Sequence, residues 1–407
     1  MKGDELVTLD DVRACARLLD GVIRATPVDR PAFLCEMAGR PVALKHEEVQ
    51  RTGSFKVRGA YCRIAAIPRA ERAAGVVAAS AGNHAQGVAL AATSLGVEAT
   101  IFMPDTAPLP KLDATRAYGA RVELVAGGLA AAMRAALDAS RESGATLVSP
   151  FDDRAVIAGQ GTIGVELAQQ APDAETVVVP VGGGGLVSGI AVAWKALRPG
   201  TRVVGVEAAG ATAMQAALQA GRPVELAAVN TIADGIAVHE VGDVTLAHVD
   251  ALVDDVVTVT DEEIARTMLL LLERRKTVVE PAGASALAAV LSGRIGGNPS
   301  SPVCAVLSGG NVDAALLVRL IEHGLSAAGR YLVVRVALSD RPGELQRLLS
   351  VIAQLGLNVV DVEHHRSGPV LPVQQVEVDL TLETRDPQHR DEILASLRKA
   401  GYRVEPR

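Results

Sequence analysis

The stretch VVVPVGGGGLVSGIAVAWKAL, residues 177–197, decides the fold class of this chain. Its valine-rich start predicts a strand buried on both faces, as in a parallel sheet. Four consecutive glycines, Gly182 to Gly185, then lead into an apolar segment that predicts a helix. Glycines let the backbone turn its N–H groups towards an anion, and a helix N-terminus adds donors and a favourable dipole. The stretch therefore predicts an α/β sheet with a phosphate cradle.

The glycine run excludes two common phosphate sites and leaves one structural alternative open. It does not match GxGxxG, and no Gly-Lys-Ser/Thr sequence follows it, so neither a dinucleotide nor a nucleoside triphosphate is indicated. A tight strand-to-helix turn without a ligand is the alternative, although such a turn needs only one or two glycines.

The same alternation of short apolar runs and alanine-rich segments continues on both sides, from about residue 75 to 325. Strand, helix and strand at this spacing predict parallel sheets covered by helices. We expect strands at residues 75–80, 99–104, 120–125, 176–182, 202–208 and 303–310.

The length and composition are those of a multidomain globular protein. At 407 residues, two or three domains are expected. Apolar residues make up 49% of the chain and charged residues 21%, which allows a large core. The net charge is −7 and charges of both signs are interspersed, so we expect no nucleic-acid partner.

The cysteines and the N-terminus place the chain in a broad class. The four cysteines lie far apart and form no CxxC pair, so neither a zinc site nor a disulfide framework is indicated. The N-terminal MKGDELVTLDDVR lacks an apolar signal core, and no apolar run is long enough to span a bilayer. We expect a soluble, cytoplasmic protein without a membrane partner.

The pattern changes at HGLSAAGR, residues 323–330, which we interpret as a hinge. Alternating segments and amphipathic segments then follow in the order βαββαβ, the ferredoxin-like arrangement. We therefore expect a separate domain at residues 330–407. The preceding region, 1–327, is expected to be a single unit with a smaller subdomain inserted at about 46–147.

Three further stretches carry residues with chemical potential. Lys56 stands in QRTGSFKVRGA (50–60), Asn83 in ASAGNHAQGVAL (79–90) and Ser308 in VLSGGNVD (306–313). Alone, each has an ordinary interpretation: a solvated lysine, a helix cap and a turn. Together with a phosphate cradle, an amine, an amide and a hydroxyl are what pyridoxal 5′-phosphate needs, because its aldehyde condenses with a lysine.

Seven motifs in order carry a family resemblance that covers most of the chain. The catalytic region resembles the fold-type II pyridoxal phosphate enzymes and, within them, the threonine ammonia-lyases. The C-terminal SDRPGEL and LGLNVVDVEHHR resemble an ACT-type amino-acid-sensing domain. The seven motifs are TGSFKVRGA, SAGNHAQGVA, VIAGQGTIGVEL, VGGGGLVSG, IADGIAV, VVEPAGA and SGGN.

The resemblance implies a role for each matching residue. Lys56 matches the Schiff-base lysine and Phe55 the residue that packs against the cofactor. Asn83 matches the partner of the ring's phenolic oxygen, and Ser308 the partner of the pyridine nitrogen. The phosphate cradle is matched by Gly182, Gly183, Gly184, Gly185 and Leu186. The loop that receives the substrate carboxylate is matched by Ser80, Ala81, Gly82, Asn83 and His84.

The resemblance also implies an activity and partners. The expected reaction is β-elimination of L-threonine, and of L-serine, to 2-oxobutanoate or pyruvate and ammonia. Lys56 would act as the general base. The expected partners are a small amino-acid substrate, an amino-acid effector at the ACT-like domain (isoleucine, valine or none), and further copies in a homodimer or homotetramer.

Rival functions remain open at this point. Serine racemases share most of the motifs, but they place a serine base where this chain has Ala81. Their divalent-cation site would need Glu207, the Ala211 carbonyl and an aspartate where Ala213 stands, so the metal is left undecided. Cysteine synthases share the fold, and a catalytically silent amino-acid sensor is a further alternative.

Several other polar residues have ordinary interpretations. Lys111 is interpreted as structural or solvated, and Glu280 either faces the cofactor or caps a helix. Glu363, His364 and His365 are interpreted as a solvated strand end, because adjacent side chains of a strand point to opposite faces.

Overall fold

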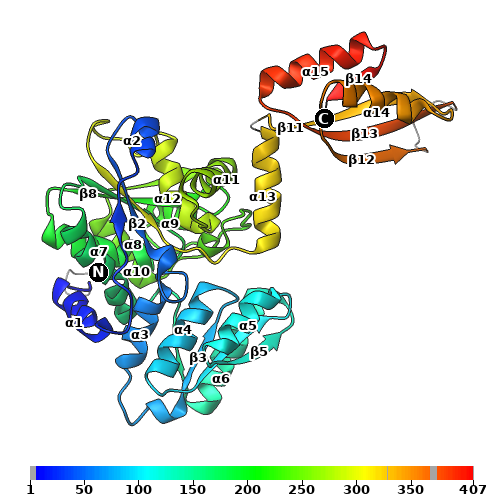
Figure 1. Cartoon of the computed structure of the whole chain (residues 1–407). Helices are drawn as coiled ribbons and strands as arrows, with labels where there is room; N and C mark the ends of the chain where they lie inside the picture. The colour runs from blue at the N-terminus through cyan, green and yellow to red at the C-terminus, as the bar shows by residue number, and fades with distance from the viewer. Residues whose placement is uncertain (1–5, 328, 367–373, 407) are drawn as a thin grey trace. The chain divides into compact units, whose positions relative to one another are not determined.

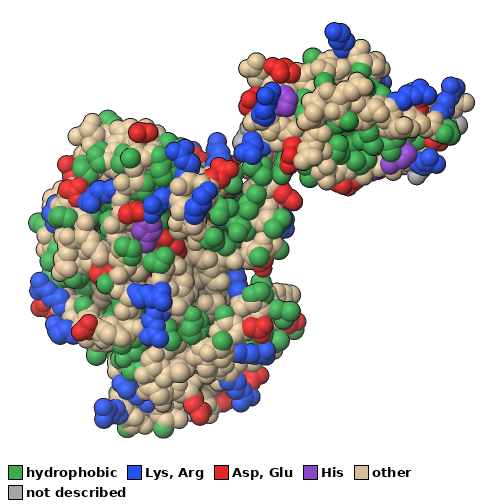
Figure 2. All heavy atoms as spheres, viewed as in Figure 1, with side chains coloured by type: hydrophobic (Ala, Val, Ile, Leu, Met, Phe, Trp, Pro, Cys, Tyr) green, Lys and Arg blue, Asp and Glu red, His purple; other side chains and the backbone are tan. Residues whose placement is uncertain are grey.

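The computed structural model describes residues 6–327, 329–366 and 374–406. The chain forms two compact units, Met1–Asp313 and Ala314–Arg407 (Figure 1). Figure 2 shows acidic and basic side chains interspersed over the visible face of each unit. No helix among the described residues is long and apolar enough to cross a membrane.

The first unit is built on a six-stranded sheet in the order β1-β2-β10-β7-β8-β9. Only β1 runs antiparallel to its neighbour, and the other pairs are parallel. Its interior strands β2, β7 and β10 are buried along their whole length, which explains their valine-rich sequences. The strands are β1 (Val28–Asp29), β2 (Val42–His46), β7 (Thr176–Pro180), β8 (Arg202–Ala208), β9 (Asp255–Val259) and β10 (Val303–Leu307).

A second, four-stranded parallel sheet in the order β5-β4-β3-β6 is formed by the chain between β2 and β7. Its core gathers alanine, valine and isoleucine side chains from the sheet and from α3 and α4. Except for Val148, the buried residues of this core lie within residues 46–147, where the sequence predicts an inserted subdomain. The strands are β3 (Val76–Ala79), β4 (Ala99–Pro104), β5 (Arg121–Val125) and β6 (Thr146–Leu147).

Helices connect the strands of both sheets, as the sequence pattern predicts. The chain order in the first unit is α1 (Leu9–Leu19), α2 (Ala32–Ala38), η2 (Glu47–Val49), α3 (Lys56–Ala65), η3 (Arg72–Ala74), α4 (Asn83–Ser94), α5 (Leu109–Ala117), α6 (Gly128–Ser143), α7 (Arg154–Gln170), α8 (Gly185–Leu197), α9 (Ala213–Ala220), η4 (Asp234–Ile236), α10 (Asp243–Leu252), α11 (Asp261–Leu270), η5 (Leu271–Arg275) and α12 (Pro281–Leu291).

The second unit contains an antiparallel sheet in the order β12-β13-β11-β14, which is the predicted ferredoxin-like βαββαβ arrangement. Its own apolar core is made by the sheet together with α14 and α15. The elements are α13 (Ala314–Ala327), β11 (Tyr331–Ser339), α14 (Glu344–Gln354), β12 (Val359–His365), β13 (Gln375–Glu383), α15 (Pro387–Lys399) and β14 (Arg403–Pro406).

The predicted hinge needs correction. Residues 323–327 are the last part of α13 and not a loop. Apolar residues at helical spacing, Leu317, Ile321 and Leu325, favour the helix and outweigh the low helix propensity of Gly324. The division between the compact units therefore lies before α13, at Asp313, rather than after it at residue 327.

Separate cores predict separate unfolding transitions. Leu397 is fully buried in the second unit, and Leu397→Ala should destabilise that unit by about 2–5 kcal/mol. Trp194 is the only tryptophan and lies in the core of the first unit. In urea unfolding, we expect the variant to shift part of the far-ultraviolet circular dichroism transition while the Trp194 fluorescence transition stays in place.

The control for this experiment is Val360→Ala, because that side chain is 52% exposed. It should leave both transitions unchanged. An equal shift of the Trp194 transition in Leu397→Ala would contradict the independence of the two cores.

Candidate active site

The predicted site residues converge on one cavity of about 400 Å³ in the first unit. Ser80 follows β3, Gly182 follows β7 and Ser308 follows β10. In parallel sheets, ligands bind where the carboxyl ends of strands meet. Every residue predicted for the cofactor or the substrate lines this cavity: Phe55, Lys56, Ser80, Ala81, Gly82, Asn83, His84, Gly182, Gly183, Gly184, Gly185, Leu186 and Ser308.

The glycine run has no room for side chains. A Cβ atom on Gly183 would overlap the ring of Phe151, and one on Gly182 would lie 2.8 Å from the Cα atom of Ile236. Gly184 has a φ of 89°, which disfavours any other residue. Helix α8 begins at the next residue, and its first N–H groups have no partners within the helix. The four glycines Gly182–Gly185, which we call the glycine wall, therefore present bare backbone that can donate hydrogen bonds to an anion.

Lys56 is the first residue of α3, and its side chain lies in the cavity. Its Nζ atom donates a hydrogen bond to the carbonyl oxygen of Pro150 at 2.8 Å and lies 5.1 Å from the centroid of the Phe55 ring. Burial lowers the pKa of the Lys56 amine to about 8, although the carboxylate of Glu280 opposes this shift. Near neutral pH the protonated amine still predominates, but a far larger fraction is neutral and nucleophilic than for an ordinary lysine.

Asn83 and Glu280 form a buried pair on the same cavity. Asn83 Nδ2 donates to Glu280 Oε1 at 2.7 Å, while Asn83 Oδ1 is buried without a hydrogen-bond partner. Glu280 stands at the N-cap of α12 but makes no side-chain capping bond, so it faces the cavity. Burial raises the pKa of the Glu280 carboxyl to about 7.

The loop before α4 and the first turn of that helix present neutral polar groups to the cavity. Burial lowers the pKa of His84 to about 3, and its Nε2 atom is 2.9 Å from the carbonyl oxygen of Val148. A neutral imidazole in this contact donates to that carbonyl. The N–H of Gly82 donates to Ser80 Oγ at 3.1 Å. Ala81 lines the cavity and carries no proton that could be transferred.

Glu207 is engaged within the protein. Its two carboxylate oxygens accept hydrogen bonds from the backbone N–H groups of Met214 and Gln215, at 2.7 and 3.1 Å. Burial raises the pKa of this carboxyl to about 7. The carboxylate thus serves the first turn of α9, in keeping with Ala213 where a cation site would need an aspartate.

The structure adds cavity residues that the sequence interpretation did not assign. The segment Asp234–Val238 and Phe151 line the cavity, as does Lys111, which we interpreted as structural or solvated. The segment Asp234–Val238 belongs to the IADGIAV motif, which was already part of the family resemblance. Phe151 and Lys111 have no local signal, because only the folded chain brings them beside the glycine run and Glu280.

A second polar cluster lies on the sheet of the other unit. Glu363, His365 and Asp379 place ligand-type atoms within 4.8 Å of one another. However, Arg335 donates two hydrogen bonds of 2.6 Å to the Asp379 carboxylate. The guanidinium already supplies the positive charge, so the geometry indicates an ion-pair cluster rather than a metal site.

Comparison with known proteins decides the family. The sequence profile described as "pyridoxal-phosphate dependent enzyme" matches residues 19–309. The chain belongs to this pyridoxal phosphate enzyme family. An ACT domain profile matches residues 332–401, which confirms the predicted second domain type.

The family's relatives include ammonia-lyases and racemases. An L-threonine ammonia-lyase of Thermotoga maritima is 46% identical over 399 residues, which cover 98% of this chain and 99% of the relative. The structure of the processed form of threonine deaminase isoform 2 from Solanum lycopersicum is 38% identical, with 79% of this chain and 94% of that chain covered and a TM-score of 0.75. Maize serine racemase is 35% identical, with 79% and 98% covered and a TM-score of 0.74.

The cavity of this chain fits the family's cofactor. The glycine wall has no room for side chains and could donate its N–H groups to a phosphate, and Lys56 could supply the amine. Two buried polar atoms, Asn83 Oδ1 and Asn311 Nδ2, lack hydrogen-bond partners within the described protein. Buried polar atoms are rarely left unpaired, so these atoms are consistent with a polar ligand in the cavity.

The shape of the glycine wall predicts the effect of one added methyl group. Gly183→Ala should weaken pyridoxal phosphate binding by about tenfold or more, because the new Cβ overlaps the Phe151 ring and forces the wall to move. Titration of cofactor-free protein by visible absorption measures this. Gly200→Ala is the matched control, since a Cβ there meets open space. Unchanged affinity in Gly183→Ala would contradict a cradle at this wall.

The lowered pKa of Lys56 predicts the pH dependence of cofactor uptake. The neutral amine is the form that bonds the aldehyde, so the rate of uptake should rise with pH and level off above about pH 8. An ordinary lysine would give a midpoint near 10.4. Stopped-flow absorption measures the rate.

The same pH dependence of cofactor uptake, measured in Glu280→Gln, tests the influence of Glu280 on Lys56. Glu280 raises the pKa of Lys56, so removing its charge should move the uptake midpoint to lower pH. The amide oxygen of glutamine can still accept from Asn83. A midpoint that moves to higher pH would show that the charge does not act on Lys56 as described.

Proposed function

We propose that this protein is an L-threonine ammonia-lyase that also accepts L-serine. The observation that carries the proposal is Lys56, a buried lysine whose pKa is lowered to about 8, in one cavity with the glycine wall. The full-length similarity to an L-threonine ammonia-lyase supports the choice of reaction.

Different residues of the cavity would bind the cofactor and the substrate. Bound pyridoxal phosphate supplies an aldehyde carbon and an electron-withdrawing ring. The N–H groups of the glycine wall would hold the phosphate, and the Ser308 hydroxyl would donate a hydrogen bond to the ring nitrogen. Asn83 orients the ring's oxygen, with Glu280 fixing the direction of its amide. The Ser80–His84 loop binds the substrate carboxylate.

Lys56 moves the proton that starts the reaction. Once its Nζ atom is free and neutral, it takes the proton from Cα of the substrate. The cavity buries the amine, so water competes poorly for it. The β-hydroxyl then takes up a proton and leaves as water, and the enamine product tautomerises and is hydrolysed by one water to a 2-oxo acid and ammonia.

Ala81 favours elimination over racemisation. Racemisation needs a second group that delivers a proton to the opposite face of Cα. The alanine cannot do so, and the neighbouring His84 is held neutral against the Val148 carbonyl. Serine racemase remains the alternative because its fold matches almost equally well.

The second unit supports a regulatory role. We infer that its ACT domain binds an amino-acid effector and that the chain forms a homodimer or homotetramer, as symmetric assembly is the common state of soluble oligomers. Isoleucine and valine are the effectors to test.

A steady-state assay tests the proposal. The protein loaded with pyridoxal phosphate should release 2-oxobutanoate and ammonia from L-threonine, and Lys56→Ala should lower kcat by about 10²-fold or more and abolish the absorption of lysine-bound cofactor. L-Serine, 3-hydroxyaspartate and added isoleucine are compared in the same assay. No turnover of L-threonine would refute the proposal, and formation of D-serine would favour the racemase.

A further inference from the structure

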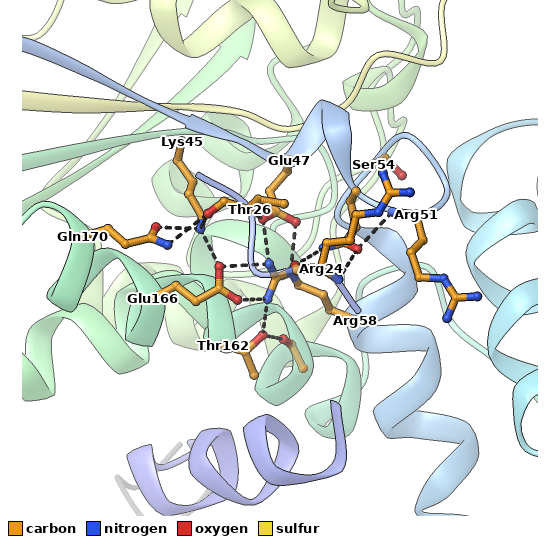
Figure 3. Close-up of polar contacts among 12 residues, drawn as sticks. Arg24, Thr26, Lys45, Glu47, Arg51, Ser54, Arg58, Thr162, Glu166 and Gln170 are labelled. Atoms are coloured by element: carbon orange, nitrogen blue, oxygen red, sulfur yellow. Dashed lines mark hydrogen bonds and ion pairs between the residues drawn. The ribbon is translucent and has the colours of Figure 1, made fainter. Parts of the chain in front are cut away.

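A network of buried charges surrounds Arg58, two residues after Lys56 (Figure 3). Arg58, Lys45 and Glu47 are fully buried, and Glu166 is mostly so. The network holds two positive and two negative side chains, so its charges balance. It does not line the cavity, and nothing in the chemistry above requires it.

Arg58 is held by two carboxylates at once. Its Nε and Nη2 atoms donate to Glu47 at 2.9 and 2.8 Å. Its Nη1 and Nη2 atoms donate to Glu166 at 2.6 and 3.1 Å, and Nη1 also donates to Thr162 at 3.0 Å. Burial alone would lower the pKa of Arg58, but the two carboxylates raise it. A planar guanidinium clamped in two such forks has a fixed position and direction.

Lys45 completes the network through hydrogen bonds to residues outside α3. Its Nζ atom donates to Glu166 at 2.5 Å, to the carbonyl oxygen of Thr26 at 2.7 Å and to Gln170 at 2.9 Å. The Thr26 hydroxyl donates to Glu47 at 2.5 Å. The network therefore joins β2, η2 and α7 of the large sheet region to α3.

Helix α3 has no side-chain cap at its first turn, and neighbouring backbone supports that turn instead: a Cβ on Gly87 of α4 would lie 3.0 Å from the carbonyl carbon of Lys56. Phe55, at the N-cap, makes no side-chain hydrogen bond to the helix. The helix also crosses α7 in direct backbone contact: a Cβ on Gly159 would lie 2.6 Å from the Cα atom of Gly59. Such a contact sets the distance between two helices, but glycines offer no side chains that would stop one from sliding along the other.

Stability alone does not account well for this arrangement. Buried ion pairs contribute little net stability compared with apolar side chains of the same size, because desolvation offsets their attraction. A bidentate ion pair instead fixes the position and direction of the guanidinium. Lys56 and Arg58 are the first and third residues of α3, separated by a rise of about 3 Å. A clamp on Arg58 therefore fixes the point from which the Lys56 side chain starts.

We propose that Arg58, clamped by Glu47 and Glu166, is a positioning residue that sets the place of Lys56 in the cavity. The inference rests on the proposed function for its kinetic readout. A displacement of about 1 Å at a reacting group is enough to lower a rate by about 10²-fold. Arg58 thus acts on the reaction through Lys56 and without contact with the substrate.

Two charge-balanced double variants test the proposal. Arg58→Met with Glu47→Gln removes the clamp on α3. Lys45→Met with Glu166→Gln removes the neighbouring, slightly more exposed ion pair; the amide oxygen of the glutamine can still accept from Arg58, and the fork between Arg58 and Glu47 remains. We expect the first variant to lose about tenfold or more in kcat and in affinity for pyridoxal phosphate, with KM for L-threonine nearly unchanged. The second double variant should stay within about threefold of the wild type in kcat, in affinity for pyridoxal phosphate and in KM for L-threonine.

Arg58→Lys keeps the charge but cannot form the forks. It should fold and still show the fall in kcat, so it decides the matter if the first double variant does not fold. Equal losses in the two double variants, or wild-type kcat in Arg58→Lys, would show that the network only stabilises the fold. Failure of the wild type to turn over L-threonine would overturn the proposed function instead, and the cofactor affinities would still test the clamp.

Discussion

The carboxyl ends of β3, β7 and β10 meet at one cavity, and the chemistry of this protein depends on that meeting. Parallel strands end at the same edge of a sheet, so loops that are far apart in the sequence come together there. Here β3 belongs to one sheet and β7 and β10 to the other, and the shared cavity collects a lysine, a glycine wall, an amide and a hydroxyl. None of these groups would suggest a cofactor site alone, but in one cavity they can hold a phosphate and bond an aldehyde.

Burial changes the pKa values of the ionisable groups in the cavity. Lys56 loses part of its solvation and its pKa falls to about 8, while the same burial raises that of Glu280 to about 7. The two groups also interact, since Glu280 counteracts the shift of Lys56. The interaction with Glu280 keeps the amine from becoming a weaker base still, which suits the proposed roles of Lys56 in bonding an aldehyde and taking a proton.

The fold allows more than one reaction, and single side chains narrow the choice. A threonine deaminase and a serine racemase resemble this chain about equally in structure. Ala81, in the loop before α4, has no side-chain group that could donate a proton. Glu207 accepts a hydrogen bond from the backbone of the first turn of α9. Function thus follows from individual positions on a shared scaffold.

The strand and helix pattern, the glycine wall and the ferredoxin-like second unit could be predicted from the sequence alone, because hydrophobic periodicity and glycine runs are local signals. The motif resemblance added Lys56, Asn83 and Ser308 to the site. Only the tertiary structure placed Phe151 against Gly183, bound Asn83 to Glu280 and clamped Arg58, because these contacts join residues distant in the chain. The helical end of α13 escaped prediction because packing and apolar spacing there outweighed the glycine that suggested a hinge.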